Sequence, residues 1–327
     1  MLPDTLKDRL SIPVIAAPMF LASGPSLVIE CCKAGVAAGF PALNQRSSEG
    51  FEAWLEEING ALAAHESESG KAPAPYGVNL VVHPSNPRLE RDLALCVKYK
   101  VPMVMSILGA DPRLVEAIHS YGGLVFHDVV NPKHARKAVE AGVDGLTAVA
   151  AGAGGHAGTL NPFALINDIR QFFDGTILLG GSISTGADVA AAQMMGADLA
   201  YIGTRFLGTK ECTVSDEYKQ MLIESVSTDI VYTPVISGVP ASFLAGSLKA
   251  AGIDPKTAEK PKMDLGLELA GAAEGGEKKA WRDIWSAGQG VGSIRDLPSA
   301  SELIGRIKAE YHQANAAQQA RLAAWSA

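Results

Sequence analysis

Residues 176–206 read TILLGGSISTGADVAAAQMMGADLAYIGTRF, and this stretch decides the fold. It opens with an apolar run, Thr176–Gly181, passes through a glycine-rich turn into a helix-like segment, Gly186–Met195, and ends in a second apolar run, Leu199–Phe206. The first run does not alternate between apolar and polar side chains. Strands that are apolar on both faces belong in a parallel sheet covered by helices. The stretch therefore predicts a strand–helix–strand unit with parallel strands.

Similar units run through the preceding part of the chain. The other β-prone runs are Pro13–Ala16, Phe40–Asn44, Gly77–Val82, Pro102–Ile107, Leu124–Val129 and Gly145–Ala150. The other helix-like stretches are Pro25–Val36, Gly50–Ala64, Arg88–Tyr99, Asp111–Tyr121, Pro132–Ala141 and Pro162–Phe173. Eight such strands alternating with helices predict an α/β fold, a closed (β/α)8 TIM barrel. An open doubly wound sheet is the structural alternative.

Several of these helices carry start or stop signals. Asn131 and Asn161 each precede a proline, an arrangement that places a capping side chain before the first helical turn. Gly122, Gly142 and Gly196 follow helical stretches, where a left-handed residue commonly ends a helix.

After Phe206 the pattern changes. Residues 210–280 predict a small, mostly helical insertion or lid, and residues from about 301 to 325 predict a long Ala- and Gln-rich helix that closes the ring. We therefore expect residues 1–209 and 281–327 to form one barrel, with residues 210–280 inserted into it.

Composition limits the function classes. The 327 residues are 47% hydrophobic and 19% charged, which is enough for a large core and excludes wholesale disorder. The formal net charge is −7, with no basic stripe, so neither nucleic acid nor an anionic membrane is the expected main partner. No apolar run is long enough to span a bilayer, and the start of the chain lacks the features of a signal peptide. The four cysteines form no metal-binding spacing, so we expect reduced thiols in a cytoplasmic protein.

In a barrel of this type, ligands bind at the carboxyl ends of the strands. The loops after the seventh and eighth strands contain Gly180-Gly181-Ser182 and Gly203-Thr204. Glycine lets the backbone approach an anion closely, and amide groups at a following helix start bind phosphate oxygens. Tight turns alone are the alternative, but the pairing of two such loops at these positions favours a phosphate site.

The loop after the sixth strand, residues 151–158, reads AGAGGHAG. It loosely matches a dinucleotide-binding pattern, which we reject because the helix does not open at the glycines. A single histidine, His156, therefore stands among residues with almost no side chains, where a flat ligand can approach it. An imidazole of near-neutral pKa suits proton transfer at carbon, and a structural histidine is the equal alternative.

Other strand ends carry weaker signals. The turn Pro18-Met19-Phe20 after the first strand is stiff and apolar, and it either faces an aromatic ring or is a plain core turn. Asn79, an amide in an apolar strand, needs polar partners: a heterocycle edge or neighbouring backbone. In His127-Asp128 only one side chain can point inward, because strand residues alternate. The chain shows no paired carboxylates, no Ser/His/Asp order and no metal-binding histidine motif at the other strand ends, so no metal is expected.

Taken together, Gly154–Gly158, Gly203–Leu207, Gly77–Leu80 and Trp285–Gln289 resemble motifs of the FMN-dependent nitronate monooxygenases, formerly called 2-nitropropane dioxygenases. The similarity covers almost the whole chain in the same order. Each motif alone is weak, and relatives that share the Gly-His loop include NADH:quinone reductases and a flavin-dependent enoyl-ACP reductase. The motifs therefore identify a flavin site better than a substrate.

The resemblance implies FMN as cofactor and a role for each matching residue. His156 matches the catalytic histidine, and Ser286 and Gln289 belong to a tail motif that lies over the substrate pocket in relatives. The implied cofactor-binding residues are Pro18, Met19, Phe20, Asn79, Gly154 and Gly155 at the ring, and Gly180, Gly181, Ser182, Gly203 and Thr204 at the phosphate.

Two positions depart from the family pattern. Ala16-Ala17-Pro18 replaces a common Gln-Gly-Gly, and Asp128 stands near the flavin where some relatives carry lysine. A carboxylate there would disfavour reduced anionic flavin.

The expected activity is oxidation of alkyl nitronates, and of nitroalkanes, by oxygen to a carbonyl compound and nitrite. His156 would then act as base or orienting group. An FMN-dependent NAD(P)H:quinone or enoyl-thioester reductase is the alternative within the superfamily, and a flavin-free barrel that binds a phosphorylated metabolite is the alternative outside it. The expected partners are a small-molecule substrate and oxygen, and a homodimer is one assembly left open.

Overall fold

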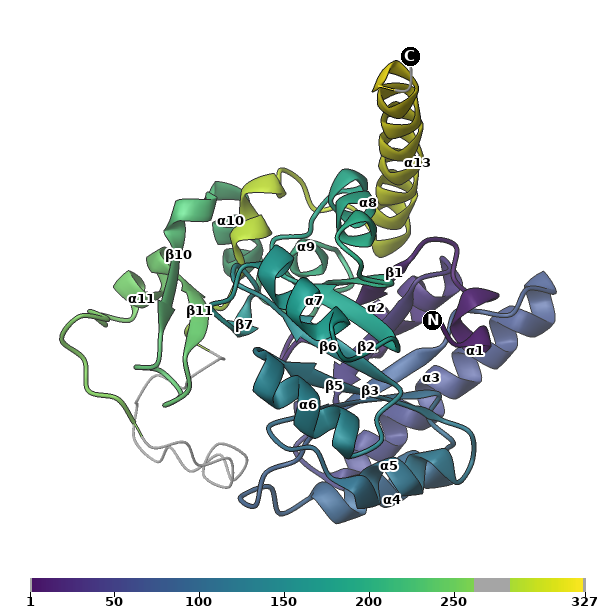
Figure 1. Ribbon diagram of the computed structural model, residues 1–327. Helices are drawn as coiled ribbons and strands as arrows, with labels where there is room; N and C mark the ends of the chain where they lie inside the picture. Colours follow the sequence, from purple (N-terminus) through teal and green to yellow (C-terminus); the bar gives the residue numbers. More distant parts are fainter. Residues whose placement is uncertain (1, 262–282, 326–327) are drawn as a thin grey trace.

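The computed structural model describes residues 2–261 and 283–325. Eight parallel strands close into a barrel in the order β1-β2-β3-β4-β5-β6-β8-β9, and helices surround it (Figure 1). The predicted TIM barrel is confirmed. The barrel strands are β1 (Val14–Ala16), β2 (Ala37–Pro41), β3 (Tyr76–Val81), β4 (Met103–Ile107), β5 (Leu124–Val129), β6 (Gly145–Val149), β8 (Thr176–Gly180) and β9 (Leu199–Ile202).

The helices follow the strands as the sequence predicts. After β1 to β8 they are α2 (Pro25–Lys33), α3 (Ser48–Ser69), α4 (Leu89–Lys98), α5 (Pro112–His119), α6 (Pro132–Glu140), α7 (Pro162–Arg170) and α8 (Gly186–Met194). Shorter elements are α1 (Asp4–Lys7), η1 (Ala42–Asn44) and α9 (Thr204–Leu207), and α13 (Ala300–Trp325) ends the described chain.

The predicted boundaries differ by more than one residue at two strands. β2 begins at Ala37 instead of Phe40, because Ala37 and Ala38 have little intrinsic β preference but are buried in the barrel wall. β9 ends at Ile202, and the residues expected to continue it form α9. The earlier strand end places Gly203 in the turn before α9 and Thr204 in its first turn, which is where a phosphate loop is expected.

The expected helix signals are confirmed. The Asn131 side chain accepts a hydrogen bond from the His134 amide, and the Asn161 side chain accepts one from the Phe163 amide. Gly142, after α6, has a φ of 87°, in the left-handed region that glycine adopts without strain.

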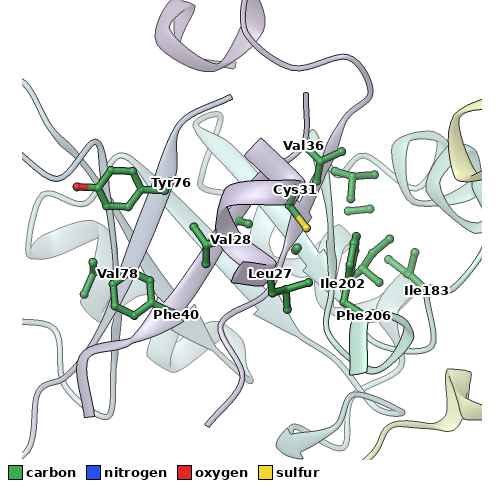
Figure 2. Packing of buried hydrophobic residues seen from close by; sticks show 14 of the residues in the cluster. Leu27, Val28, Cys31, Val36, Phe40, Tyr76, Val78, Ile183, Ile202 and Phe206 are labelled. Atoms are coloured by element: carbon green, nitrogen blue, oxygen red, sulfur yellow. The ribbon is translucent and has the colours of Figure 1, made fainter. Parts of the chain in front are cut away.

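The core has two layers. Between the strands and the helices, Leu27, Val28 and Cys31 of α2 pack towards outward-facing residues such as Phe40 and Val78 (Figure 2). Inside the barrel, inward-facing residues form a second cluster, which Leu6 of α1 joins. Its members include Met103, Met105, Phe126, Leu178, Leu199 and Tyr201. The barrel interior is thus filled with side chains, so a ligand has room only at its mouth.

The segment after α9 contains α10 (Asp216–Glu224), η2 (Ser227–Asp229) and α11 (Ala245–Ala250). It also contains an antiparallel pair, β10 (Ile230–Thr233) and β11 (Ala241–Leu244), which the helical interpretation of the sequence missed. β11 pairs in turn with β7 (Gly155–His156), from the loop after β6. Residues 262–280 of the predicted insertion lie outside the described residues.

The long helix α13 packs against α8 and α2 at its start, and its C-terminal half projects beyond the barrel (Figure 1). The contact with α8 is close: the Gly186 amide donates to the Glu310 carboxylate at 2.8 Å. A Cβ at Gly186 would lie 2.1 Å from the backbone nitrogen of Tyr311. Glycine is therefore required for this helix pair to meet.

Two negative findings concern the described part of the chain. None of its helices has the length and apolar character needed to cross a membrane. The four cysteines are all buried and unpaired with one another.

Gly186→Ala should lower the free energy of unfolding by about 1–3 kcal/mol, because the added methyl group overlaps backbone atoms of α13 that cannot move independently. Urea denaturation followed by circular dichroism measures the change. The control is Gly305→Ala in the same helix pair, where a Cβ would meet nothing within 4 Å. That change should raise the free energy of unfolding by about 0.5–1 kcal/mol. Equal effects of the two substitutions would contradict the close packing.

Candidate active site

A cavity of about 460 Å³ opens at the carboxyl ends of the barrel strands. Its lining comes from loops far apart in the sequence, which the closed barrel brings to one place. Nearly all the residues singled out from the sequence line it: Pro18, Met19, Phe20, Asn79, Asp128, Gly154, Gly155, His156, Gly180, Gly181, Ser182, Gly203, Thr204 and Ser286.

Gln289 is the exception. It lines a second, smaller cavity of about 240 Å³, which shares Gly152 with the first. Its backbone amide donates to the Gly152 carbonyl at 2.9 Å. Gln289 thus supports the loop after β6 on the side of the smaller cavity, and its contact with a substrate stays a prediction.

The turn after β8 presents unused amides. Within the described residues, the amides of Gly181, Ser182 and Ile183 donate no hydrogen bond to another group. Gly181 has a φ of 137° and Ser182 a φ of 56°, so both lie in the left-handed region, which costs a serine about 1–2 kcal/mol. Such a turn, with successive amides open to a cavity, is suited to an anion.

The helix that follows does not contribute its N-terminus, contrary to the sequence-based expectation. The Thr185 hydroxyl and the Asp188 carboxylate form a capping box at the start of α8, and Asp188 also accepts from the Ser184 amide. The Gly186 amide is bonded to Glu310. The Thr185 hydroxyl and the two carboxylates thus accept from the amides of Ser184, Thr185, Gly186 and Asp188, so most amides at this helix start are not open to an anion.

The second glycine-rich loop lies beside the first. Gly203 lines the cavity, and a Cβ there would meet Ala17 and Met19 at an ordinary contact distance of 3.8 Å. The Thr204 hydroxyl accepts a hydrogen bond from the Gly288 amide at 2.8 Å. Arg205 faces away from the cavity, is 3% exposed and bonds Asp296.

His156 is held in a sheet. As part of β7 it pairs with Ala241 of β11, and its Nε2 lies 3.2 Å from the Ser237 hydroxyl. The single Ser237 hydroxyl proton is donated to the Val239 carbonyl, so Ser237 accepts from His156 and the ring proton belongs on Nε2. Burial lowers the pKa of His156 to about 4, so the imidazole is neutral at physiological pH.

Ser286, from the C-terminal part of the chain, fixes the position of β7, the strand that contains His156. The Ser286 hydroxyl accepts from the Gly155 amide at 2.8 Å and donates to the Ser242 carbonyl at 2.7 Å. The Tyr218 hydroxyl bonds the Ser286 carbonyl, and its ring stacks on Trp285 with centroids 5.0 Å apart. Ser286 was expected to meet the substrate, but both hydroxyl hydrogen bonds are used to position the loop.

Polar groups lie on the cavity floor. The Asn79 side-chain amide donates to the Met105 carbonyl at 3.0 Å, so backbone satisfies part of this residue while it still lines the cavity. Asp128 also faces the cavity, whereas His127 points to the opposite side of β5 and lies 2.7 Å from the Ser106 hydroxyl. Burial lowers the pKa of His127 to about 4.

Three polar atoms in this region make no hydrogen bond within the described residues: Asp128 Oδ1, Thr147 Oγ1 and Tyr201 Oη. Burial raises the pKa of Asp128 to about 7, an effect that the neighbouring Thr147 hydroxyl partly offsets. Unsatisfied buried polar atoms are rare and need an explanation. A polar ligand edge above them supplies one.

The lining carries little charge. Among the described residues around the main cavity there is no lysine and no arginine, and Asp128 is the one carboxyl group. The described residues also contain no cluster of His, Cys, Asp and Glu suited to a metal ion.

These features fit FMN. The open amides after β8 suit its phosphate, and the unsatisfied atoms on the floor suit the heteroatoms of its ring. His156 lies in the same cavity, beside glycines that leave room for a flat ring.

Sequence reasoning missed two cavity residues. Tyr201 lies in β9, where strand alternation together with inward-facing Leu199 would have placed its hydroxyl inside the barrel. Tyr218 lies on α10, and no local pattern marks it, because its place depends on how the insertion packs.

Comparisons with known proteins agree with this geometry. A family model described as nitronate monooxygenase matches residues 36–310. A nitronate monooxygenase of Paraburkholderia phytofirmans is 27% identical, with 92% of each chain covered. A (3aS,4S,5R,7aS)-5-hydroxy-7a-methyl-1-oxo-octahydro-1H-indene-4-carboxyl-CoA dehydrogenase of Rhodococcus jostii is 24% identical, covering 91% of this chain and 92% of its own. A nitroalkane oxidase of Streptomyces ansochromogenes has a similar structure, with a TM-score of 0.79 at 24% identity, covering 96% of this chain and all of its own; at that identity the likeness shows the fold alone.

Ser286→Ala should destabilise the protein by about 1–3 kcal/mol, because it removes both hydrogen bonds that join Gly155 to Ser242 and leaves buried polar groups unpaired. Hydrogen exchange should quicken at the amide of Gly155 in particular. Ser299→Ala, at an exposed helix start, serves as the control and should leave the amide of Gly155 unchanged. An unaltered exchange rate of the Gly155 amide in Ser286→Ala would contradict the hydrogen bond from Gly155 to Ser286.

Proposed function

Because the chain belongs to the nitronate monooxygenase family and is therefore an oxidoreductase, we propose that it uses FMN to oxidise alkyl nitronates, and nitroalkanes, with oxygen. The products are a carbonyl compound and nitrite. FMN, when bound, supplies the electron transfer between the organic substrate and oxygen.

One observation carries the proposal: a neutral imidazole and an amide cradle open into the same cavity. The residues that would hold the cofactor are the amides of Gly181, Ser182 and Ile183 at the phosphate, with Asn79 and Asp128 at the ring. Pro18, Met19 and Phe20 form the apolar side of the cavity.

The charge of His156 determines which step it performs. A neutral imidazole can accept a proton from the carbon next to a nitro group, but it offers no positive charge to a nitronate. The described lining supplies no lysine or arginine to offer one either. We therefore assign His156 as the base for a neutral nitroalkane, with a preformed nitronate bypassing that step. The stacked pair Tyr218 and Trp285 forms an aromatic part of the cavity wall.

His156→Asn should lower kcat/KM for a neutral nitroalkane by about 10²- to 10⁴-fold, because the general base is lost. The preformed nitronate should lose much less, and FMN binding, followed by absorbance, should persist. His65→Asn on α3, outside the cavity lining, is the control. Unchanged turnover of the nitroalkane by His156→Asn would refute the base role.

The pH profile tests the protonation state. A base works in its deprotonated form, so a pKa lowered to about 4 keeps His156 competent to lower pH than an ordinary histidine. We expect kcat/KM for a neutral nitroalkane to stay level on acidification until roughly pH 5 and to fall below it. A fall centred near pH 6.5 that persists in Asp128→Asn would contradict the burial of His156.

A reductase is the second candidate, because the cavity mouth is unusually apolar. Phe20, Leu21 and Leu108 are 37–39% exposed there, which suits a substrate with a large apolar group. The similarity to the Rhodococcus carboxyl-CoA dehydrogenase points the same way. Anaerobic mixing with NADH or NADPH separates the candidates: rapid flavin bleaching supports the reductase, and bleaching by a nitronate alone supports the oxidation. A protein that stays colourless after FMN is added would contradict both.

A further inference from the structure

The cavity floor contains a group of polar side chains that the proposed reaction does not use. Leu124 and Phe126 of β5 pack in the barrel interior, so alternation places Asp128 inward at the end of the same strand. Thr147 lies opposite Asp128 in the register of β5 and β6. Tyr201 points inward from β9.

Gly180 lies beside Tyr201. It belongs to β8, between the strands of Thr147 and Tyr201, and a Cβ there would make ordinary van der Waals contact with the Tyr201 ring, 3.5 Å away. Tyr201 and Asp128 line the same cavity, and the charge of Asp128 raises the pKa of Tyr201, second to the effect of burial.

The surroundings of Asp128 provide no compensating charge. The other titratable groups that line the cavity are His156 from β7, Tyr201 from β9 and Tyr218 from α10, and all are neutral at physiological pH. Asn79 from β3 and Thr147 from β6 are uncharged. His127, the chain neighbour, points to the other side of the sheet. An ionised Asp128 would therefore be the sole full charge among the described lining residues.

We propose that Asp128, with Tyr201 beside it, is a proton-linked control on the cofactor: it holds a negative charge while the flavin is oxidised and takes up a proton when the flavin is reduced. The inference rests on the proposed function insofar as it requires FMN in this cavity. It does not depend on the identity of the organic substrate.

The physical reason is Coulomb repulsion. Two electrons from an external reductant enter the flavin ring, and a nearby carboxylate then opposes the added negative charge. A proton from solvent forms an O–H bond with the Asp128 carboxyl and removes the repulsion. Asp128 needs only a modest further rise in its pKa for this uptake, because burial already brings it to about 7. Asp128 Oδ1, which makes no hydrogen bond within the described residues, is available to receive the proton.

The test uses the FMN-loaded protein and a reference dye of known potential, reduced anaerobically together across a range of pH. Above about pH 8, Asp128→Asn should favour the reduced flavin over wild type by about tenfold or more, because the opposing charge is gone. Near pH 5, where the wild-type carboxyl is protonated in both states, the two proteins should agree. Tyr201→Phe should move the pH at which the curves separate without abolishing the separation.

Glu140→Gln is the matched control, since it removes an exposed carboxylate on α6 away from the cavity, and it should follow wild type at every pH. A constant offset between wild type and Asp128→Asn, or no offset at all, would overturn the inference. If Asp128→Asn fails to fold, Asp128→Ser, which also removes the carboxylate, takes its place in the same comparison of potential against pH. Curves of wild type and Asp128→Ser that stay parallel from pH 5 to above pH 8 would overturn the inference, whereas a failure to bind FMN would instead contradict the proposed function.

Discussion

The common direction of the eight barrel strands is the constraint on which the site depends. Because all eight are parallel, their carboxyl ends meet at one rim, and residues as distant in sequence as Pro18, Asn79, His156 and Ser182 share one cavity. The packed interior below the rim excludes a ligand from the rest of the barrel. The candidate site is therefore confined to the rim, where the loops and the last inward-facing residues of the strands, such as Asn79 and Asp128, form it.

Low charge is the second feature of the cavity. The described lining offers an anion backbone amides, and neither lysine nor arginine. Backbone dipoles are fixed and add no net charge, so the ionisation of His156 and Asp128 is governed mainly by burial. Burial keeps the histidine neutral and brings the carboxyl close to neutrality. The two roles that we propose, His156 as a base and Asp128 as a group that responds to the charge of the cofactor, thus depend on the same physical effect.

The sequence predicted what depends on local pattern. Apolar runs located the strands, Asn131 and Asn161 marked helix starts, and glycine loops marked the phosphate end of the cavity. The sequence-based prediction failed where tertiary packing determines which groups already have hydrogen-bond partners. The start of α8 looks available to an anion until Thr185 and Asp188 are seen to cap it. From the sequence, the Ser286 hydroxyl looks free to bind a substrate, but in the structure it makes two hydrogen bonds within the protein. Such facts concern partners distant in sequence, which no local motif encodes.

The insertion is the clearest case, because its described part belongs to the active site. β11 pairs on one side with β10 and on the other with the strand that carries His156. Ser237, from the turn between β10 and β11, contacts the imidazole, and Tyr218 of α10 fixes the segment that clamps Gly155. Opening this part as a rigid lid would break the pairing of β11 with β7 or carry His156 away from the cavity. The described insertion therefore forms a wall that sets the position of the histidine, while Phe20 and Leu108 form an apolar mouth of the same cavity.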